Sequence, residues 1–125
     1  MSMEIETIYG QVIGKANNYM VVPDGNGKRL IKNEKIREYE RLFANQCKIY
    51  RNKRISSRFQ LFVHVYNTSD RFDLDNALKT ICDCLQYVGA ITDDNLCTKI
   101  VAEKSIDRRN PRVEFMIVEE QLNLF

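Results

Sequence analysis

The pattern of apolar and polar positions predicts strands in several parts of the chain. The clearest is residues 59–66, where apolar side chains at every second position, beginning with Phe59 and Leu61, would form one buried face. Weaker patterns of the same kind predict strands over residues 4–13, 18–22, 96–104 and 112–118. The turn-forming residues of segment 23–27 predict a loop.

Two other segments carry apolar residues at intervals of three and four, which is the spacing of one face of an α-helix. The first helix is predicted to begin near Asn33, a good N-cap, and its apolar face includes Ile36 and Phe43. The second is predicted over residues 74–88, with Gly89 as its C-terminal stop. The order β-(β)-α-β-α-β-β favours two helices packed on a small mixed sheet, in an α/β or α+β fold.

The chain has 125 residues, of which 44% are apolar and 29% charged. This length fits one domain, residues 1–120, followed by a short tail, residues 121–125. The apolar runs are far too short to span a membrane, and the N-terminus lacks the basic and apolar segments of a signal peptide. We therefore expect a cytoplasmic protein without a membrane partner.

Positive charge is concentrated in one part of the chain. Residues 28–58, called the basic block below, contain eleven Lys and Arg against three Glu, a net charge of +8. Because the whole chain carries +2, the remaining residues carry −6. A basic segment beside an acidic remainder favours an anionic partner such as nucleic acid. A solvated helix and loop would explain the same composition, so charge alone leaves both interpretations open.

Aspartates lie around both ends of the second predicted helix. Asp73 and Asp75 lie where the 59–66 strand has ended and the helix begins, and Asp94 follows the helix. Three converging carboxylates would bind a hard cation such as Mg²⁺, which activates water and neutralises phosphate charge in phosphodiester hydrolysis. Lys79, four residues after Asp75, would then hold a phosphate oxygen.

Each of these residues also has an ordinary structural explanation. Asp73 would cap the helix, and Asp75 and Lys79 would form a surface ion pair. Asp94 would belong to a polar turn. A helix of about 15 residues is roughly 22 Å long, so Asp94 reaches Asp73 only if the next strand starts beside the first turn of the helix. Spacing alone leaves both explanations open.

The segment from Arg71 to Lys79 reads Arg-Phe-Asp-Leu-Asp-Asn-Ala-Leu-Lys, and Asp83-Cys84-Leu85 and Asp93-Asp94 follow it. This combination closely resembles the RusA-type Holliday junction resolvases. The resemblance is detailed over residues 71–104. It implies a crossover junction endodeoxyribonuclease of DNA recombination and repair. Such an enzyme would depend on Mg²⁺, with Mn²⁺ as an alternative metal, and would act as a homodimer on four-way DNA junctions.

The resemblance also implies roles for individual residues. The catalytic metal ligands would be Asp73, Asp75 and Asp94, and Lys79 would be the catalytic lysine. The family member used for comparison has a run of arginines before the first aspartate, where this chain has only one, so we expect the basic block to supply further contacts. The expected DNA-binding residues are Arg71, Lys104, Arg51, Lys53 and Arg54.

The chain ends in Gln121-Leu122-Asn123-Leu124-Phe125. This segment resembles the short peptide by which bacterial DNA enzymes bind the polymerase sliding clamp. Leu122, Leu124 and Phe125 would fill an apolar groove, and Gln121 would fix the orientation through hydrogen bonds. The alternative is a chain end that packs on its own domain.

Two functions from different classes remain. One is a junction endonuclease docked on the sliding clamp, encoded by a bacterium or its prophage. The other is a non-catalytic branched-DNA-binding adaptor that recruits the clamp. The intact aspartates and Lys79 favour the enzyme, because a binding module has no need to gather acids near phosphates.

Overall fold

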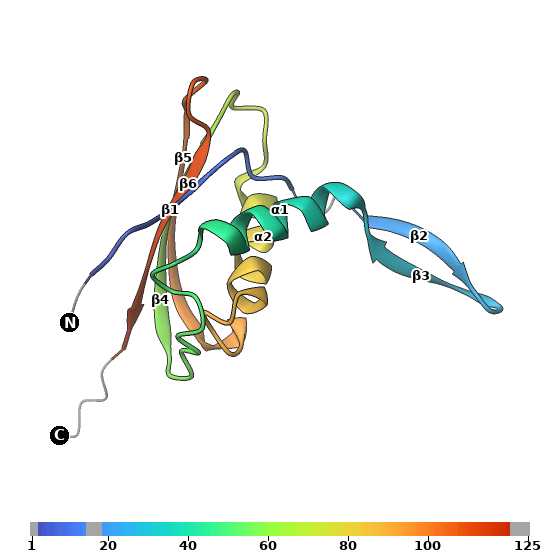
Figure 1. The fold of residues 1–125 in the computed structure, drawn as a ribbon, viewed down its shortest axis with the longest axis horizontal. Helices are drawn as coiled ribbons and strands as arrows, with labels where there is room; N and C mark the ends of the chain where they lie inside the picture. Colours follow the sequence, from blue (N-terminus) through green and yellow to red (C-terminus); the bar gives the residue numbers. More distant parts are fainter. Residues whose placement is uncertain (1–2, 15–18, 121–125) are drawn as a thin grey trace.

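The computed structural model describes residues 3–14 and 19–120, which form one layer of strands and one layer of helices (Figure 1). The sheet has the order β1-β6-β4-β5. Its strands are β1 (Glu6–Tyr9), β4 (Phe59–Asn67), β5 (Cys97–Ile106) and β6 (Arg112–Glu119). One face is covered by α1 (Glu34–Gln46) and α2 (Leu74–Tyr87). A separate hairpin consists of β2 (Tyr19–Asp24) and β3 (Gly27–Lys32), and a short 3-10 helix, η1 (Asp94–Leu96), precedes β5. The predicted fold class is confirmed.

The direction of the strands positions the two ends of α2. β5 is parallel to β4, whereas the β1–β6 and β4–β6 pairs are antiparallel. The helix that connects two parallel strands must run back along them. The start of α2 therefore lies where β4 and β5 end, and η1 lies at the opposite end, where both strands begin.

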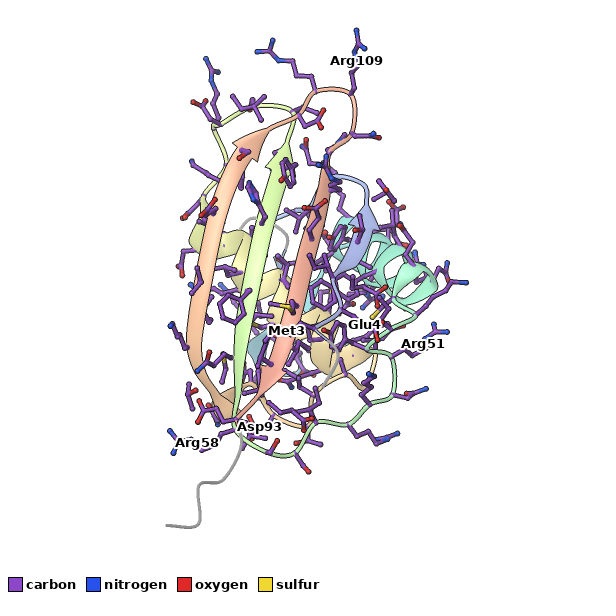
Figure 2. All side chains as sticks on the ribbon, turned by 90° about the vertical axis from the view of Figure 1, so that its left-hand side faces the viewer. Met3, Glu4, Arg51, Arg58, Asp93 and Arg109 are labelled. Carbon is purple, nitrogen blue, oxygen red and sulfur yellow. The ribbon has the colours of Figure 1, made fainter. Side chains whose placement is uncertain are left out.

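The core lies between the sheet and the helices. Every second residue of β4 from Phe59 onward is buried, as the alternation predicts, and these side chains pack with Ile81 and Leu85 of α2. The intervening β4 residues are half-buried, and they lie on the face without helices, which Figure 2 shows. None of the helices in the part of the chain that the structure describes is long and apolar enough to cross a membrane.

The caps predicted for the helices are confirmed. The side chain of Asn33 accepts a hydrogen bond from the backbone N–H of Ile36. Gly89, just after α2, has a φ of +72°, a conformation that favours glycine. The first strand is shorter than the predicted 4–13, because the chain turns at Gly10, where φ is +117°.

The prediction of a loop over residues 23–27 is wrong. Pro23 pairs with Lys28 and Asp24 pairs with Gly27, so only two residues form the turn. Pro23 has no backbone N–H to donate. Because this sheet has only two strands, the outer edge of β2 has no neighbouring strand that would need that donor. β3 escaped prediction because its basic residues interrupt the apolar pattern. Val21 and Leu30, which pair directly across the hairpin, are each 62% exposed.

One buried carboxylate joins the N-terminal strand to the end of α1. Glu6 is only 5% exposed, and its Oε1 accepts hydrogen bonds from the backbone N–H groups of Lys48, Ile49 and Tyr50 at 2.9, 2.8 and 3.3 Å. The Cys47 thiol donates to the same oxygen at 3.2 Å. Burial, and then this hydrogen bond, raises the pKa of the Cys47 thiol to about 12, so the thiol remains a neutral donor at pH 7.

Glu6→Ala should lower the free energy of unfolding by about 3 kcal/mol or more, because it leaves several buried donors without an acceptor. Chemical denaturation measures this loss. Glu6→Gln retains an acceptor oxygen and should lose less, and Glu4→Ala, on the exposed neighbouring position, serves as the matched control. A loss below about 0.5 kcal/mol for Glu6→Ala would show that these hydrogen bonds of Glu6 do not stabilise the fold.

Candidate active site

Asp73 ends the β4–α2 loop and caps α2. Its Oδ1 accepts a hydrogen bond from the backbone N–H of Asp75 at 3.0 Å, and its backbone carbonyl accepts one from Ala77 at 3.1 Å. Asp73 and Asp75 are both exposed. The capping explanation for Asp73 is therefore confirmed, and capping leaves the side chain accessible from solvent.

Asp75 and Lys79 form an ion pair on one face of α2. Lys79 Nζ lies 3.3 Å from Asp75 Oδ2, with the two side chains 56% and 73% exposed. An exposed pair of this kind contributes less than about 1 kcal/mol. Lys79 can therefore exchange Asp75 for a phosphate, and Asp75 can exchange Lys79 for a cation, at little cost in free energy.

Asp94 lies at the other end of α2. Its backbone N–H donates to Gln86 Oε1 at 3.1 Å, and Gln86 belongs to the last turn of the helix. Asp75 and Gln86 are eleven positions apart, which corresponds to about 16 Å along the helix axis. The next strand thus starts beside the last turn of α2, and not beside its first turn as a close approach to Asp73 would require.

One cavity nevertheless runs along α2 between the two ends. Side chains of both Asp75 and Asp94 line it, together with Lys79, Asp83, Leu78 and Ile100. Asp73 lines a different cavity, with Arg71 and Asn76. Among the described residues, no three His, Cys, Asp or Glu side chains form a group that could hold a metal ion. The structure therefore places Asp75, Lys79 and Asp94 around one space, with Asp73 in a second cavity at the start of α2.

Sequence reasoning did not include Asp83 among the site residues. It follows Lys79 by four residues and Asp75 by eight, which places all three on one side of the helix. This spacing of four residues is the sequence signal that identifies Asp83 as a further candidate for the site. Asp83 adds a third carboxylate to the cavity that contains Asp75 and Asp94.

Lys104, an expected DNA-binding residue, lies at the Asp73 end of the site. Its Nζ donates to the backbone carbonyl oxygens of Asp70 and Phe72. Arg71, between these two residues, is exposed and lines the same cavity as Asp73. Arg71 thus belongs to the loop that presents the first carboxylate, and Lys104 contacts this loop.

The basic residues Arg51, Lys53 and Arg54 are exposed in the connection between α1 and β4. This connection lies along residues 88–92: the backbone N–H of Arg54 donates to Gly89, and Ile55 forms a bridge with Ile91. The structure therefore brings the connection to the end of α2 where Asp94 lies. The expected clamp-binding residues Gln121, Leu122, Leu124 and Phe125 lie outside the described residues.

Comparison with protein-family models gives a match over most of the chain. No curated protein sequence matches this chain. The family model described as Endodeoxyribonuclease RusA matches residues 10–118, which include β4, α2, η1 and β5 with every carboxylate of the candidate site. This chain is therefore a member of the RusA family of endodeoxyribonucleases.

Proposed function

We propose that this nuclease resolves four-way DNA junctions by paired symmetric nicks, with a divalent metal ion, as a homodimer. The observation that supports the site most directly is the single open cavity lined by Asp75, Lys79 and Asp94. Exposed carboxylates and a lysine around one space are the groups that phosphodiester hydrolysis uses. The match to the RusA model supports the substrate class.

The donor chemistry of the site fits Mg²⁺, or Mn²⁺ in its place. The carboxylates of Asp73, Asp75 and Asp94 are hard oxygen ligands, and their exposure leaves room for the waters that Mg²⁺ retains. When bound, the metal would activate a water and neutralise charge on the scissile phosphate. Since one chain spreads the three carboxylates along α2, we propose that they act together only in the assembled complex with DNA.

Lys79 and Arg71 would act on the phosphates themselves. The exposed ammonium of Lys79 exchanges Asp75 for a phosphate oxygen and stabilises the negative charge that develops during cleavage. Arg71 holds a neighbouring phosphate beside Asp73, where its guanidinium suits two-point contact. These roles need only small side-chain movements, because both residues are exposed.

Dimerisation follows from the reaction. Resolving a junction requires nicks in two opposing strands, and each chain has one such cavity lined by Asp75, Lys79 and Asp94. A two-fold dimer places two identical sites across the two-fold axis of the junction. Sedimentation at micromolar concentration should therefore give twice the monomer mass of 14.7 kDa.

The deciding experiment uses a synthetic four-way junction with each strand end-labelled in turn. Incubation with Mg²⁺ or Mn²⁺ should give nicks at symmetric positions in two opposing strands, and EDTA should abolish them. Linear duplex and flap substrates of the same sequence test structural selectivity. Metal-independent binding without nicking would instead support the branched-DNA adaptor.

Neutralising Arg51, Lys53 and Arg54 together to glutamine should weaken junction binding and flatten its salt dependence. Each phosphate contact that is lost should reduce the slope of log affinity against log salt by about 0.9. Fluorescence anisotropy from 50 to about 300 mM salt measures both quantities. Arg108→Gln with Arg109→Gln is the comparison variant: both arginines are exposed and follow the end of β5, on the Asp73 side, and Arg109 lies at the opposite end of the sheet from Arg58 (Figure 2). Equal slopes for the triple variant and the wild type would place the DNA elsewhere.

We also propose that residues 121–125 bind the bacterial sliding clamp. Deleting them should abolish clamp binding and leave cleavage of a free oligonucleotide junction unchanged. The expected affinity is micromolar, about −8 kcal/mol, because a short peptide buries little area. Calorimetric titration of the clamp against full-length and shortened protein measures the effect. Equal binding by both proteins would contradict docking through the tail, and unfolding of the shortened protein would favour a tail that packs on its own domain.

A further inference from the structure

Lys104 makes contacts that a lysine used only to bind DNA would not need. It lies near the end of β5, opposite Val65 of the parallel strand β4. From there its Nζ donates to the backbone carbonyl oxygens of Asp70, at 3.0 Å, and Phe72, at 3.1 Å. We propose that Lys104 is a positioning residue that holds the 70–72 loop, and thereby the carboxylates of Asp73 and Asp75, in place. This inference rests on the proposed function.

The two carbonyl groups belong to alternate residues of the loop. Both carbonyl oxygens lie within hydrogen-bond distance of Nζ, and one ammonium group has three donors, so Lys104 binds both. Asp73 follows directly and is extended, with φ −88° and ψ 116°. Its backbone carbonyl is already bound by Ala77 of α2. Asp73 is therefore fixed from the helix on one side and from β5, through Lys104, on the other.

The ring of Phe72 adds a third contact. Lys104 Nζ lies 5.1 Å from the centroid of this ring, within the range of a cation–π interaction. Phe72 itself is half-buried and packs against the hydrophobic core. The ammonium group thus ties the loop to a side chain that the core already holds, and not only to exposed backbone.

Position along the sheet separates Lys104 from the other lysine of β5. Lys99 is exposed on the same strand, near the end where Asp94 lies, and is opposite Gln60 of β4. Five strand residues correspond to about 16 Å, so the Lys99 side chain does not reach the 70–72 loop. Lys99→Met therefore removes the same charge from the same strand without releasing the loop, and it is the matched control for Lys104→Met.

The test combines a measurement on the metal-free protein with one on the active enzyme. Amide hydrogen exchange by NMR should show that Lys104→Met accelerates exchange at Asp75 and Ala77, whose N–H groups are bound by Asp73, by about tenfold, or about 1.4 kcal/mol of opening free energy. The Mg²⁺ concentration for half-maximal cleavage should rise by a similar factor. The junction dissociation constant measured in EDTA should change less than about twofold, because the ammonium group faces the loop. Lys104→Arg, which keeps a cation with several donors, should restore most of the protection and the Mg²⁺ midpoint.

The alternative outcomes are distinct. Unchanged exchange in Lys104→Met, with junction affinity reduced tenfold or more, would overturn the proposal and make Lys104 a direct DNA contact. Equal exchange and Mg²⁺ effects in Lys99→Met would also overturn it, since the effect would then come from charge alone. If the wild-type protein cleaves no junction with any divalent metal, the proposed function fails. The exchange comparison in the metal-free protein would still decide whether Lys104 holds the loop.

Discussion

Asp75→Asn should abolish junction cleavage while junction binding is retained, and the same result is expected for Asp73→Asn and Asp94→Asn. Each change removes one negative charge and one hard oxygen ligand while nearly preserving shape. The loss of rate should be at least as large as the 10²–10³-fold that removing one preorganised charge typically costs. Binding of the junction in EDTA should be equal to wild type or tighter, since the phosphates then face less negative charge.

The fold should survive the changes at Asp73 and Asp75 for a reason specific to each position. Asparagine caps helices as well as aspartate does, so Asp73→Asn keeps the hydrogen bond from the backbone of Asp75. The ion pair between Asp75 and Lys79 is exposed and contributes little to stability. Unchanged melting temperatures would therefore accompany the loss of activity.

Asp93→Asn provides the matched control for Asp94→Asn. Asp93 is exposed, and its Oδ1 caps η1 by accepting a hydrogen bond from Asn95 at 2.9 Å, a role that asparagine also fills. Single-turnover cleavage at saturating Mg²⁺ should be normal in this variant. Substantial cleavage by any of the three aspartate variants under the same conditions would remove that residue from the site.

Lys79→Ala should reduce the single-turnover cleavage rate by about 10²–10³-fold, with only a modest loss of junction affinity. The reason is that the lysine would make its decisive contact with charge that develops during cleavage, whereas many phosphate contacts contribute to binding. Rapid-quench kinetics with excess enzyme separate the rate from the affinity. The Mg²⁺ midpoint should not rise, because the variant frees Asp75 from its present partner.

Lys99→Ala is a suitable control for this variant too, since it removes an exposed lysine near Asp94 that lies outside the cavity. A loss of affinity together with normal single-turnover chemistry in Lys79→Ala would make Lys79 a docking residue. If Lys79→Ala has both the cleavage rate and the junction affinity of the wild type, the ion pair with Asp75 is left as the role of Lys79.

Elements with one buried face were predictable from the sequence. β4 buries every second side chain, and α2 packs its apolar face on the core, so their periods of two and about 3.6 stand out, and Asn33 and Gly89 mark helix ends by local chemistry. None of the hairpin side chains that the structure describes is buried, so no buried face imposes a pattern on β3. The sequence pattern therefore predicts no strand over residues 28–32, where β3 lies.

The sequence points to the residues of the candidate site and not to their arrangement in space. Whether Asp94 lies beside the first or the last turn of α2 depends on the direction of β5 relative to β4, and strand direction leaves no local signal. The contact between Lys104 and Phe72 joins residues 32 positions apart, and it exists only because the parallel register places Lys104 at the end of β4. Neither the place of Asp94 along α2 nor the contact between Lys104 and Phe72 can be inferred from composition or spacing.

The hairpin of β2 and β3 has a consequence for the way the protein unfolds. None of its side chains that the structure describes belongs to the hydrophobic core, and it projects from the body (Figure 1). A two-stranded hairpin without a packed face is marginally stable in water. It can therefore open and close many times while the sheet and helices remain intact, outside the cooperative unit that melts as a whole. Thermal denaturation then measures the unfolding of the sheet and helices alone. The stability of the hairpin depends on the surface to which it binds.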